Sequence, residues 1–465
     1  MVKLAEFDRY MAYLCEGLGY ATRHQSLLDY CSGLMLPIER KSVEPLAAHA
    51  DPLNVRAKHQ ALHHFVANAR WSDRVLLDRV RGYVEPHLGL HRGAFWIVDD
   101  TGHPKHGSHS VGVARQYCGQ LGKQDNCQVA VSLSLATAEA SVPVDYQLYL
   151  PEAWAEDAGR RRAAGVPDTV QFATKPQIAL AQIRAAKACG VPQGIVLADA
   201  AYGSNTAFRE GLNELELSYA VGVISSATVW GPGAAPLPPA PYQGRGRVPT
   251  RLRRAPGHEP LSVKQLALAL KRSAWRKVAW REGTNQTLSS RFARVRVRVA
   301  HRDYLRTSMH EEQWLLIEWP STEAEPTKYW LSNLPANISI KRLVDTAKMR
   351  WRIEHDYHEL KQEFGLSHYE GRGWLGFHHH ATLCIAAYGF LSAQRLKHAS
   401  KKNSTRLQTA ALPEDYQPRG SRTSATSRAR LHTDAALSHR HSHRTSSAAL
   451  PLLRIRGHAR VTQYN

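Results

Sequence analysis

Two short apolar runs, each ending at an acidic residue, constrain the fold of this chain more than any other feature. The first is Phe95–Asp99 (Phe-Trp-Ile-Val-Asp) and the second is Gly194–Asp199 (Gly-Ile-Val-Leu-Ala-Asp). A short run that is rich in β-branched residues and bounded by turn residues predicts a buried strand. An acid at the last position of such a strand lies at a sheet edge, where α/β folds build binding sites. The runs therefore predict a sheet with two carboxylates at one edge.

The segments around these runs predict the rest of an α/β domain. Apolar residues that alternate or run together predict strands, and apolar residues at helical spacing predict helices. The predicted strands are Cys127–Ala136, Val142–Leu150 and Ser218–Ile224, and the predicted helices are Lys175–Cys189 and a segment capped by Ser204-Asn205-Thr206 that reaches Leu215. The order is β-β-β-α-β-α-β, with the acids on the first and fourth strands. Gly102–Asp125 is too long for a tight turn and is expected to be functional or bulged.

A third carboxylate is predicted on a helix that runs from Ser339 through Lys361. Its second half contains neither Gly nor Pro. At about 100° per residue, Arg350, Glu354 and Lys361 share one face of this helix. That face offers a carboxylate to a divalent metal ion and two cations to a phosphate chain. With the two strand-end acids, Glu354 would complete an oxygen-only site suited to Mg²⁺ or Mn²⁺.

Each of these acids also has a purely structural interpretation. Asp100 follows Asp99 directly, and it can cap the turn that we expect after the strand, whereas Asp99 closes the strand itself. Asp199 can serve only to begin a turn. Glu354 and Arg350 can form a surface pair worth a few tenths of a kcal/mol, although Arg before Glu is the weaker order for such a pair.

Composition narrows the class of partner. The chain has 465 residues, and its 61 Lys and Arg outnumber its 40 Asp and Glu, a formal net charge of +21. This excess of positive charge indicates a polyanionic partner, most simply nucleic acid. The six cysteines form no Cys-x-x-Cys pair, which argues against a zinc ribbon and suits reduced thiols in a cytosol. No apolar run reaches the length of a membrane span, so we expect a cytoplasmic protein without a membrane partner.

The segments that flank the predicted sheet carry much of the positive charge. Residues 1 to about 90 look helical, with interleaved basic and His residues that suit either a DNA-binding domain or a solvated helical bundle. Residues 226–340 contain a Pro-, Gly- and Ala-rich linker, a basic irregular stretch, a possible basic helix at Leu261–Arg276, and strands at Phe292–Ala300, Gln313–Trp319 and Lys328–Ser332. Alternation places Arg294, Arg296 and Arg298 on one strand face, either to follow phosphates or as a solvated surface. Ala381–Leu396 is expected to be a core helix.

The C-terminal segment from Ser400 to Asn465 differs in composition from the rest. It is rich in Ser, Thr, Ala, Arg and His and has few large apolar residues before Leu450. Such a segment lacks the periodicity that builds a core and is expected to be disordered. The same composition also resembles an out-of-frame translation, which a frameshift near Arg419 would explain.

The segment around Glu354 resembles the Y-x2-R-x3-E-x6-K signature of bacterial insertion-sequence DDE transposases, in the group with a β-strand insertion before the last acid. Arg350, Glu354 and Lys361 match the R, E and K positions, whereas Ala347 stands at the Y position and departs from the pattern. Asp99-Asp100-Thr101 resembles the D-x-T motif at the first strand of this family. Asp199-Ala200-Ala201-Tyr202 resembles its second-acid motif.

This resemblance implies a ribonuclease H-like α/β fold with a mixed-sheet core. The resemblance covers about residues 90–395 and implies the first part of the core (91–225), a β-rich insertion (226–340) and the last core helices (341–398). The helical DNA-binding domain predicted at 1–90 resembles the family more loosely, and the basic tail predicted at 399–465 does not resemble it. Asp99, Asp199 and Glu354 would hold two Mg²⁺ (or Mn²⁺) ions. With these ions they would cleave transposon ends and transfer strands into target DNA.

The resemblance also implies DNA contacts and an assembly. Arg350, Lys361, Trp330 and Arg372 would bind DNA, and the Trp330 ring would stack on a flipped base, with a place in the core as the alternative. The protein would act as a homodimer on double-stranded DNA. Two other functions stay open: a decayed copy that binds DNA without cutting it, and a ribonuclease H-like nuclease that hydrolyses but never joins strands.

Overall fold

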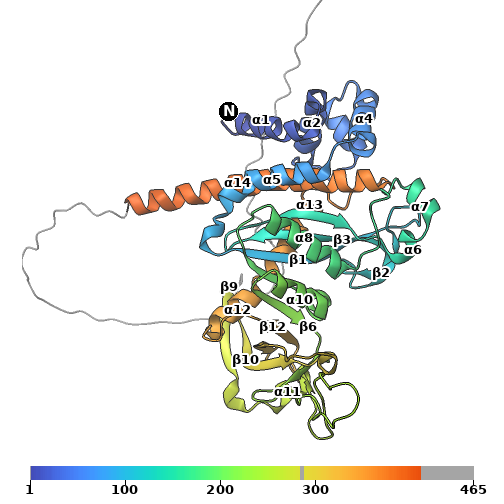
Figure 1. The fold of residues 1–465 in the computed structure, drawn as a ribbon. Coiled ribbons are helices and arrows are strands. Elements are labelled where there is room, and N and C mark those ends of the chain that lie inside the picture. The colour runs from blue at the N-terminus through green and yellow to red at the C-terminus, as the bar shows by residue number, and fades with distance from the viewer. Residues whose placement is uncertain (1, 283–286, 410–465) are drawn as a thin grey trace, which may run out of the picture. The chain divides into compact units, whose positions relative to one another are not determined.

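A mixed β-sheet is formed by strands between Phe95 and Ser332, and helices come before and after it in the chain (Figure 1). The structure is a computed structural model, and it describes residues 2–282 and 287–409. In chain order the strands are β1 (Phe95–Pro104), β2 (Ala114–Cys118), β3 (Lys123–Ala136), β4 (Ser141–Leu148), β5 (Ile195–Ala198), β6 (Tyr219–Val223), β7 (Thr228–Trp230), β8 (Leu261–Ser262), β9 (Arg276–Glu282), β10 (Thr287–Val299), β11 (Glu312–Trp319) and β12 (Lys328–Ser332).

The spatial order of the strands is β2-β3-β1-β5-β6-β12-β11-β10-β7-β8, with β4 paired to β3 and β9 paired to β10. Strand β1 is antiparallel to β3 and parallel to β5, and β5 is parallel to β6. From β6 onward the pairs are antiparallel, beginning with β6 and β12. The parallel centre and the antiparallel extension therefore belong to one continuous sheet.

Helices cover both faces of the central strands. They are α1 (Val2–Cys15), α2 (His24–Leu34), α3 (Val43–Ala50), α4 (Val55–His63), α5 (Asp73–Leu88), α6 (Glu152–Ala155), α7 (Ala158–Ala163), α8 (Lys175–Ala188), α9 (Ala200–Gly203), α10 (Thr206–Glu214), α11 (Val263–Ala269), α12 (Ile340–Lys348), α13 (Trp351–Gln362) and α14 (Trp374–Thr409). Six short helical turns, η1–η6, lie at Glu16–Leu18, Ala21–Arg23, His64–Asn68, Leu90–Arg92, Arg272–Ala274 and Asp303–Leu305. Asp99 pairs with Ser132, whose hydroxyl meets that of Tyr357 on α13, so α13 covers the Asp99 face. Gln182 of α8 donates to the Val131 carbonyl (3.0 Å) from the other face.

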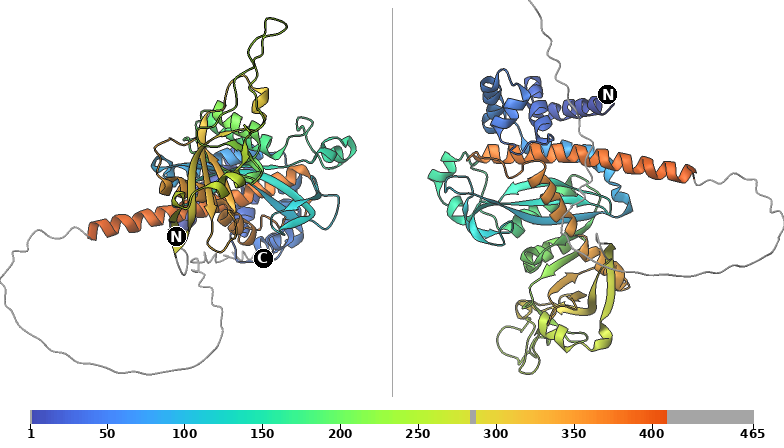
Figure 2. Two further views of the ribbon diagram at one scale, coloured as in Figure 1. Left: turned by 90° about the horizontal axis from the view of Figure 1, so that it is seen from below. Right: turned by 180° about the vertical axis from the view of Figure 1, so that it is seen from behind.

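The N-terminal helices pack against α14, and their apolar residues share one core with the central strands (Figure 2). The Tyr10 hydroxyl, for example, donates to the Ala386 carbonyl at 3.0 Å. Two cations of this region hold the bundle together: Lys41, only 3% exposed, donates to the Leu34 carbonyl, and Lys58 pairs with Asp29 at 2.7 Å. DNA binding by residues 1–90 stays a prediction.

Strand β1 is longer than its apolar run predicts. It continues beyond Asp99 through Gly102 and Pro104, because β3 pairs with it along this whole length. Gly and Pro are depleted in strands, so a prediction from local propensity ends the strand before Gly102. Pairing with β3 determines where the strand ends in the structure. The predicted loop at Gly102–Asp125 contains the end of β1, the strand β2 and the start of β3. Asp99 therefore lies within its strand and not at its last position.

The helical segments also differ in extent from their predictions. The helix predicted from Ser339 through Lys361 is two helices, α12 and α13, separated by a turn at Met349 and Arg350. The helix predicted at Leu261–Arg276 ends at Ala269, and the chain from Arg276 pairs with β10. Helix α14 begins before the core helix predicted at Ala381–Leu396 and continues to Thr409, so the prediction of disorder from Ser400 is wrong for residues 400–409. The rest of the predicted tail lies outside the described residues. None of the described helices combines the length and apolar composition that a membrane span requires.

The three arginines of the Arg/Val alternation in β10 have protein partners. Arg294 stacks over the Trp314 ring at 4.5 Å and donates to the Ile338 carbonyl. The Arg296 guanidinium lies 5.0 Å from the centroid of the same ring, and Arg298 donates to the His310 carbonyl at 2.8 Å. These contacts bind the guanidinium groups to a ring of β11 and to nearby backbone carbonyls, which favours the structural interpretation of the Arg/Val alternation.

Candidate active site

Asp99 and Asp199 lie level with each other on neighbouring parallel strands. The register pairs Ile97 with Leu197, and β5 ends one residue later at Ala198. Two residues after Ile97 and Leu197 come Asp99, which is still in β1, and Asp199, which follows the end of β5. Asp199 begins α9, where its Oδ1 accepts hydrogen bonds from two backbone amides, at 2.9 and 3.4 Å. The end of β5 thus places Asp199 on the lining of a cavity, whereas the Asp99 side chain is nearly buried.

The Arg350 guanidinium joins the carboxylates of two distant elements. Its Nη1 donates to Asp99 Oδ2 at 2.6 Å, and its Nη2 donates to Glu354 Oε1 at 2.8 Å. The Asp99 side chain is 13% exposed, that of Arg350 is 26% exposed and that of Glu354 is 62% exposed. Arg350 therefore anchors the start of α13 to β1 and joins Glu354 to Asp99.

The charges at this site are strongly coupled. Burial raises the pKa of Asp99 to about 7; the nearby Arg350 opposes that rise, while Asp199 and Asp100 add to it. Burial acts to lower the pKa of Arg350, but the charges of Asp99, Glu354 and Asp199 outweigh it and raise the pKa. All three predicted carboxylates thus act on one cation, and they focus negative potential at one place.

Asp100 belongs to the opposite face of the sheet. Successive side chains of a strand point to opposite faces, and the carboxylate of Asp100 forms an ion pair with Lys175 of α8. It has a structural partner there, whereas Asp99 faces Asp199 and Arg350. The geometry favours Asp99 as the acid of the site.

A cavity of about 440 Å³ opens beside the carboxylates. Its lining includes Asp199, Arg350 and Glu354 together with aromatic residues of the β extension, among them Trp280 and Trp330. Trp330 is 8% exposed and lies opposite Gly222 of β6 in the sheet. The Trp330 ring is therefore mostly packed, and it lines the same cavity as Asp199 and Glu354, whereas Asp99 is not among the lining residues.

Lys348 is a cavity residue that sequence reasoning missed. Its ammonium group lies 4.3 Å from the Trp280 ring centroid and 5.5 Å from that of Trp330, and it pairs with Glu318 at 2.6 Å. The Glu318 side chain is 5% exposed, so this ion pair is nearly buried. The sequence did contain a signal for this pair: Glu318 is the one acid in the apolar strand Gln313–Trp319, and a buried acid requires a cationic partner.

The two remaining cations proposed for DNA lie in different surroundings. Lys361 donates to the Gly102 carbonyl at 2.9 Å and to Gln120 Oε1 at 3.1 Å, and burial lowers its pKa to about 8. Arg372 is exposed in the loop before α14, where its carbonyl accepts from the Val111 amide at 3.0 Å. Neither lines the cavity beside the carboxylates.

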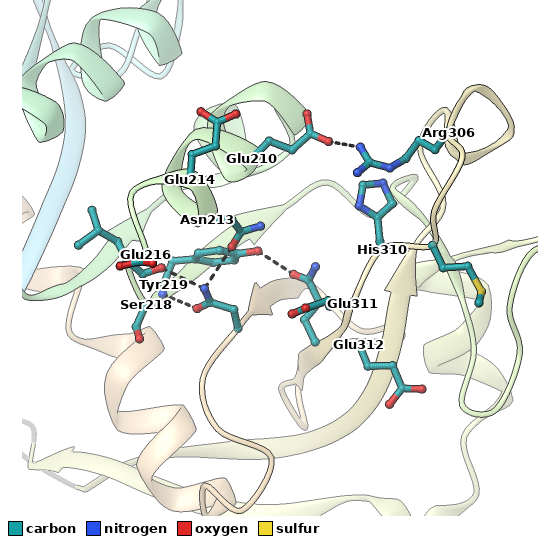
Figure 3. Close-up of a pocket in the computed structure, with 14 residues that line it drawn as sticks. Glu210, Asn213, Glu214, Glu216, Ser218, Tyr219, Arg306, His310, Glu311 and Glu312 are labelled. Carbon is teal, nitrogen blue, oxygen red and sulfur yellow. Dashed lines mark hydrogen bonds and ion pairs between the residues drawn. The ribbon is translucent and has the colours of Figure 1, made fainter. Parts of the chain in front are cut away.

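A second, larger cavity of about 750 Å³ lies between α10 and β11 (Figure 3). Five glutamates line it: Glu210, Glu214, Glu216, Glu311 and Glu312. Arg306 pairs with Glu210 at 2.6 Å, and the Tyr219 hydroxyl donates to Gln313 Oε1 at 3.1 Å (Figure 3). A cavity with this charge repels phosphate, so the smaller cavity is the better candidate for nucleic acid.

The donor chemistry of the carboxylate site fits a hard divalent cation, because its acids offer oxygen atoms alone. Within residues 2–282 and 287–409, no group of three or more His, Cys, Asp or Glu side chains is close enough to hold a metal ion. Arg350 lies between the carboxylates and supplies the positive charge that they require. A metal would therefore take over the neutralising role of this guanidinium.

Comparison with known proteins places the chain in a family. The family described as "DDE superfamily endonuclease" matches residues 13–287, more than half of the chain, a range that includes Asp99 and Asp199 but ends before Glu354. A curated relative from Microchaete diplosiphon, the probable transposase for insertion sequence element IS701, is 34% identical over 169 residues. That similarity covers 36% of this chain and 41% of the relative, so the chain spans well under half of the relative's length. The resemblance of the motifs to insertion-sequence DDE transposases is confirmed, and the chain belongs to the DDE superfamily of endonucleases.

Proposed function

We propose that this protein is a DNA transposase that cleaves transposon ends and joins them to target DNA, with Asp99, Asp199 and Glu354 as its catalytic carboxylates. The observation that carries the proposal is that Arg350 bonds Asp99 of β1 and Glu354 of α13, while the charge of Asp199, at the end of β5, also acts on this guanidinium. The acids are far apart in sequence, and their shared cation gives them one location. Family membership supports an endonuclease activity.

We propose further that the centre of the sheet is a ribonuclease H-like core. Its strands β1, β3, β4, β5 and β6 lie in the order β4-β3-β1-β5-β6, with β2 as a hairpin partner of β3. The first acid then lies on the first core strand, the second at the end of the fourth, and the third on a later helix. This agrees with the arrangement that the motifs imply. Strands β7–β12 take the place of the β-rich insertion between the second and third acids.

Divalent ions, Mg²⁺ or Mn²⁺, held by the three carboxylates would activate the attacking oxygen and stabilise the leaving oxygen. Asp199 is already oriented for this, because its Oδ1 is fixed by the α9 amides. Asp99 is held by Arg350, and the exposed Glu354 has room to turn toward the aspartates. When the carboxylates are neutralised, Arg350 is free to bind a DNA phosphate at the cavity entrance.

The remaining proposed contacts are also with DNA. Trp330 faces the shared cavity and would stack on an unpaired base. Lys361 and Arg372 would bind phosphates on either side. We propose that the enzyme acts in the cytoplasm as a homodimer on double-stranded DNA, because two element ends have to be joined in one event.

The test is the Asp199→Asn variant on DNA that carries the element end. Asn begins helices as well as Asp does, so α9 should keep its capping bonds while the carboxylate is lost. We expect Mg²⁺-dependent cleavage to fall at least a thousandfold and DNA binding to stay within about twofold. Asp157→Asn is the matched control, because Asp157 also caps a short helix, α7, by accepting from the Arg160 amide at 2.9 Å. Cleavage retained by the Asp199 variant would remove this residue from the site.

A second measurement separates the two alternatives. A wild-type chain that cleaves element ends but gives no joined product with a target plasmid would be a nuclease without strand transfer. A chain that binds ends and cuts nothing would be a decayed copy, and restoring the reading frame near Arg419 would then be the next step.

A further inference from the structure

The segment between β7 and β8 forms a projecting arm. Residues 231–260 contain no helix, and two isolated bridges are their only β pairing: Leu237 with Arg253, and Ala255 with His258. In the left view of Figure 2 this segment extends well past the strands from which it arises. Irregular segments of this length are uncommon within a compact domain and are usually functional.

The base of the arm is firmly anchored. Leu237 and Arg253 exchange two backbone hydrogen bonds, both at 2.9 Å. Arg254 pairs with Asp303 at 2.6 Å, and the Trp230 indole donates to the other oxygen of that carboxylate, also at 2.6 Å. The Asp303 side chain is 1% exposed, so this junction is a buried polar contact. The arm therefore leaves the sheet in a defined direction.

The tip of the arm, residues 241–251, is exposed at every position. It carries Arg245, Arg247 and Arg251, and no acid occurs between Trp230 and Glu259. Among the described residues, none forms a hydrogen bond, ion pair or ring contact with these three guanidinium groups. This distinguishes them from the three arginines of the Arg/Val alternation in β10, which bind a ring of β11 and nearby backbone carbonyls.

Backbone conformation sets how these arginines are presented. Gly244 and Gly246 both have φ of +78°, a left-handed conformation that other residues adopt at a cost, and an added Cβ at either position would meet open space. The glycines thus turn the chain at the tip and alternate with Arg245 and Arg247. Exposed Tyr242 lies beside them on the same tip.

We propose that the arm tip, residues 241–251, binds the phosphate backbone of duplex DNA outside the cleavage site. The inference rests on the proposed function and assigns a surface to it. Guanidinium groups bind phosphate oxygens through paired hydrogen bonds, and a cluster without acidic neighbours keeps its full charge for that partner. The proline-rich flanks keep the free arm extended and so reduce the entropy lost on binding.

The position of the arm predicts where on the DNA it binds. Five strand spacings of about 4.8 Å, roughly 24 Å in total, separate β5 at the carboxylates from β7 at the base of the arm. At about 3.4 Å for each base pair, this distance corresponds to about seven base pairs from the scissile phosphate. The arm would therefore bind flanking or subterminal duplex and leave the cleaved bond to the carboxylate site.

The test is the salt dependence of DNA affinity in the full chain, with a fluorescein-labelled random duplex of about 40 base pairs as the probe. Each phosphate contact adds about 0.9 to the slope of log K against log salt concentration. The Arg245→Gln/Arg247→Gln variant should lower the slope by about 1.8 and weaken binding roughly 60-fold at 0.1 M salt. Its matched control is Arg162→Gln/Arg184→Gln, which removes the same charge from exposed positions on α7 and α8.

The outcomes separate the arm from the proposed function. A lower slope in the arm variant with a wild-type slope in the control would support the arm. Equal slopes for both variants and the wild type, in a wild type that binds the duplex, would overturn the arm alone. A wild-type chain that does not bind the duplex would overturn both. Circular dichroism melting should show no loss of folding, because Arg245 and Arg247 form no hydrogen bond, ion pair or ring contact with the described residues, and the Arg184–Glu214 pair of the control is exposed.

Discussion

Replacing Asp99 by asparagine is expected to stabilise the metal-free protein at neutral and alkaline pH while abolishing cleavage. Burial raises the pKa of this carboxyl from an ordinary 3.8 to about 7. The folded state therefore holds its proton more tightly than the unfolded state, and the free energy of unfolding falls as the pH rises from about 4 to about 7. A difference of about three pH units corresponds to about 4 kcal/mol at pH 8. The asparagine side chain is uncharged, like the protonated acid, so the variant should not lose this stability as the pH rises.

The measurement is urea denaturation in EDTA, near pH 4 and at pH 8, for wild type and variant. The gap between the two proteins should be small near pH 4 and should approach about 4 kcal/mol at pH 8. Glu354→Gln is the control in the same site: that side chain is 62% exposed, so its replacement should change the free energy of unfolding by less than about 0.5 kcal/mol. The reasoning would be refuted by an Asp99→Asn variant that is less stable than wild type at pH 8. It would also be refuted if the difference in free energy of unfolding between the two proteins did not change with pH.

Two further predictions concern other charged groups. Because burial lowers the pKa of Lys361 to about 8, duplex affinity measured by anisotropy should fall between pH 7 and pH 9, and Lys361→Arg should lose that part of the dependence. A dependence that survives in the arginine variant would contradict this role. Arg74→Met strips the buried Asp145 of its ion-pair partner and should cost about 3–5 kcal/mol in urea denaturation. Arg40→Met removes an exposed pair with Glu370 and should cost under about 1 kcal/mol; equal costs would contradict the assignment.

The strands that carry the aspartates could be predicted because their signal is local. Asp99 and Asp199 each follow a compact apolar run, and a buried strand needs such a run whatever its partners are. The spatial order of the strands had no local signal and was not predicted. The third acid was recognisable from its spacing to Arg350 and Lys361 within one segment.

Long-range partners decided what could not be predicted. Strand β1 continues through Gly102 because β3 pairs with it there, and the sequence near Gly102 does not indicate this pairing. Arg350 was expected on the face of an unbroken helix, but it lies at the turn before α13 and reaches Asp99, 251 positions earlier in the chain. Lys348 and Glu318 form a buried pair whose members lie on different elements. Each of these contacts depends on packing between elements that no short window contains.

The pairing of β6 with β12 has a consequence for how DNA must enter the site. Trp330 lies opposite Gly222, and a Cβ at Gly222 would come within 2.9 Å of the Ala200 amide, directly after Asp199. The aromatic cavity wall and the second carboxylate are thus joined through one strand, with no hinge between them. We therefore expect the DNA, and not the protein, to bend when the two fit together. Element ends with easily kinked pyrimidine–purine steps beside the cut should then be the better substrates.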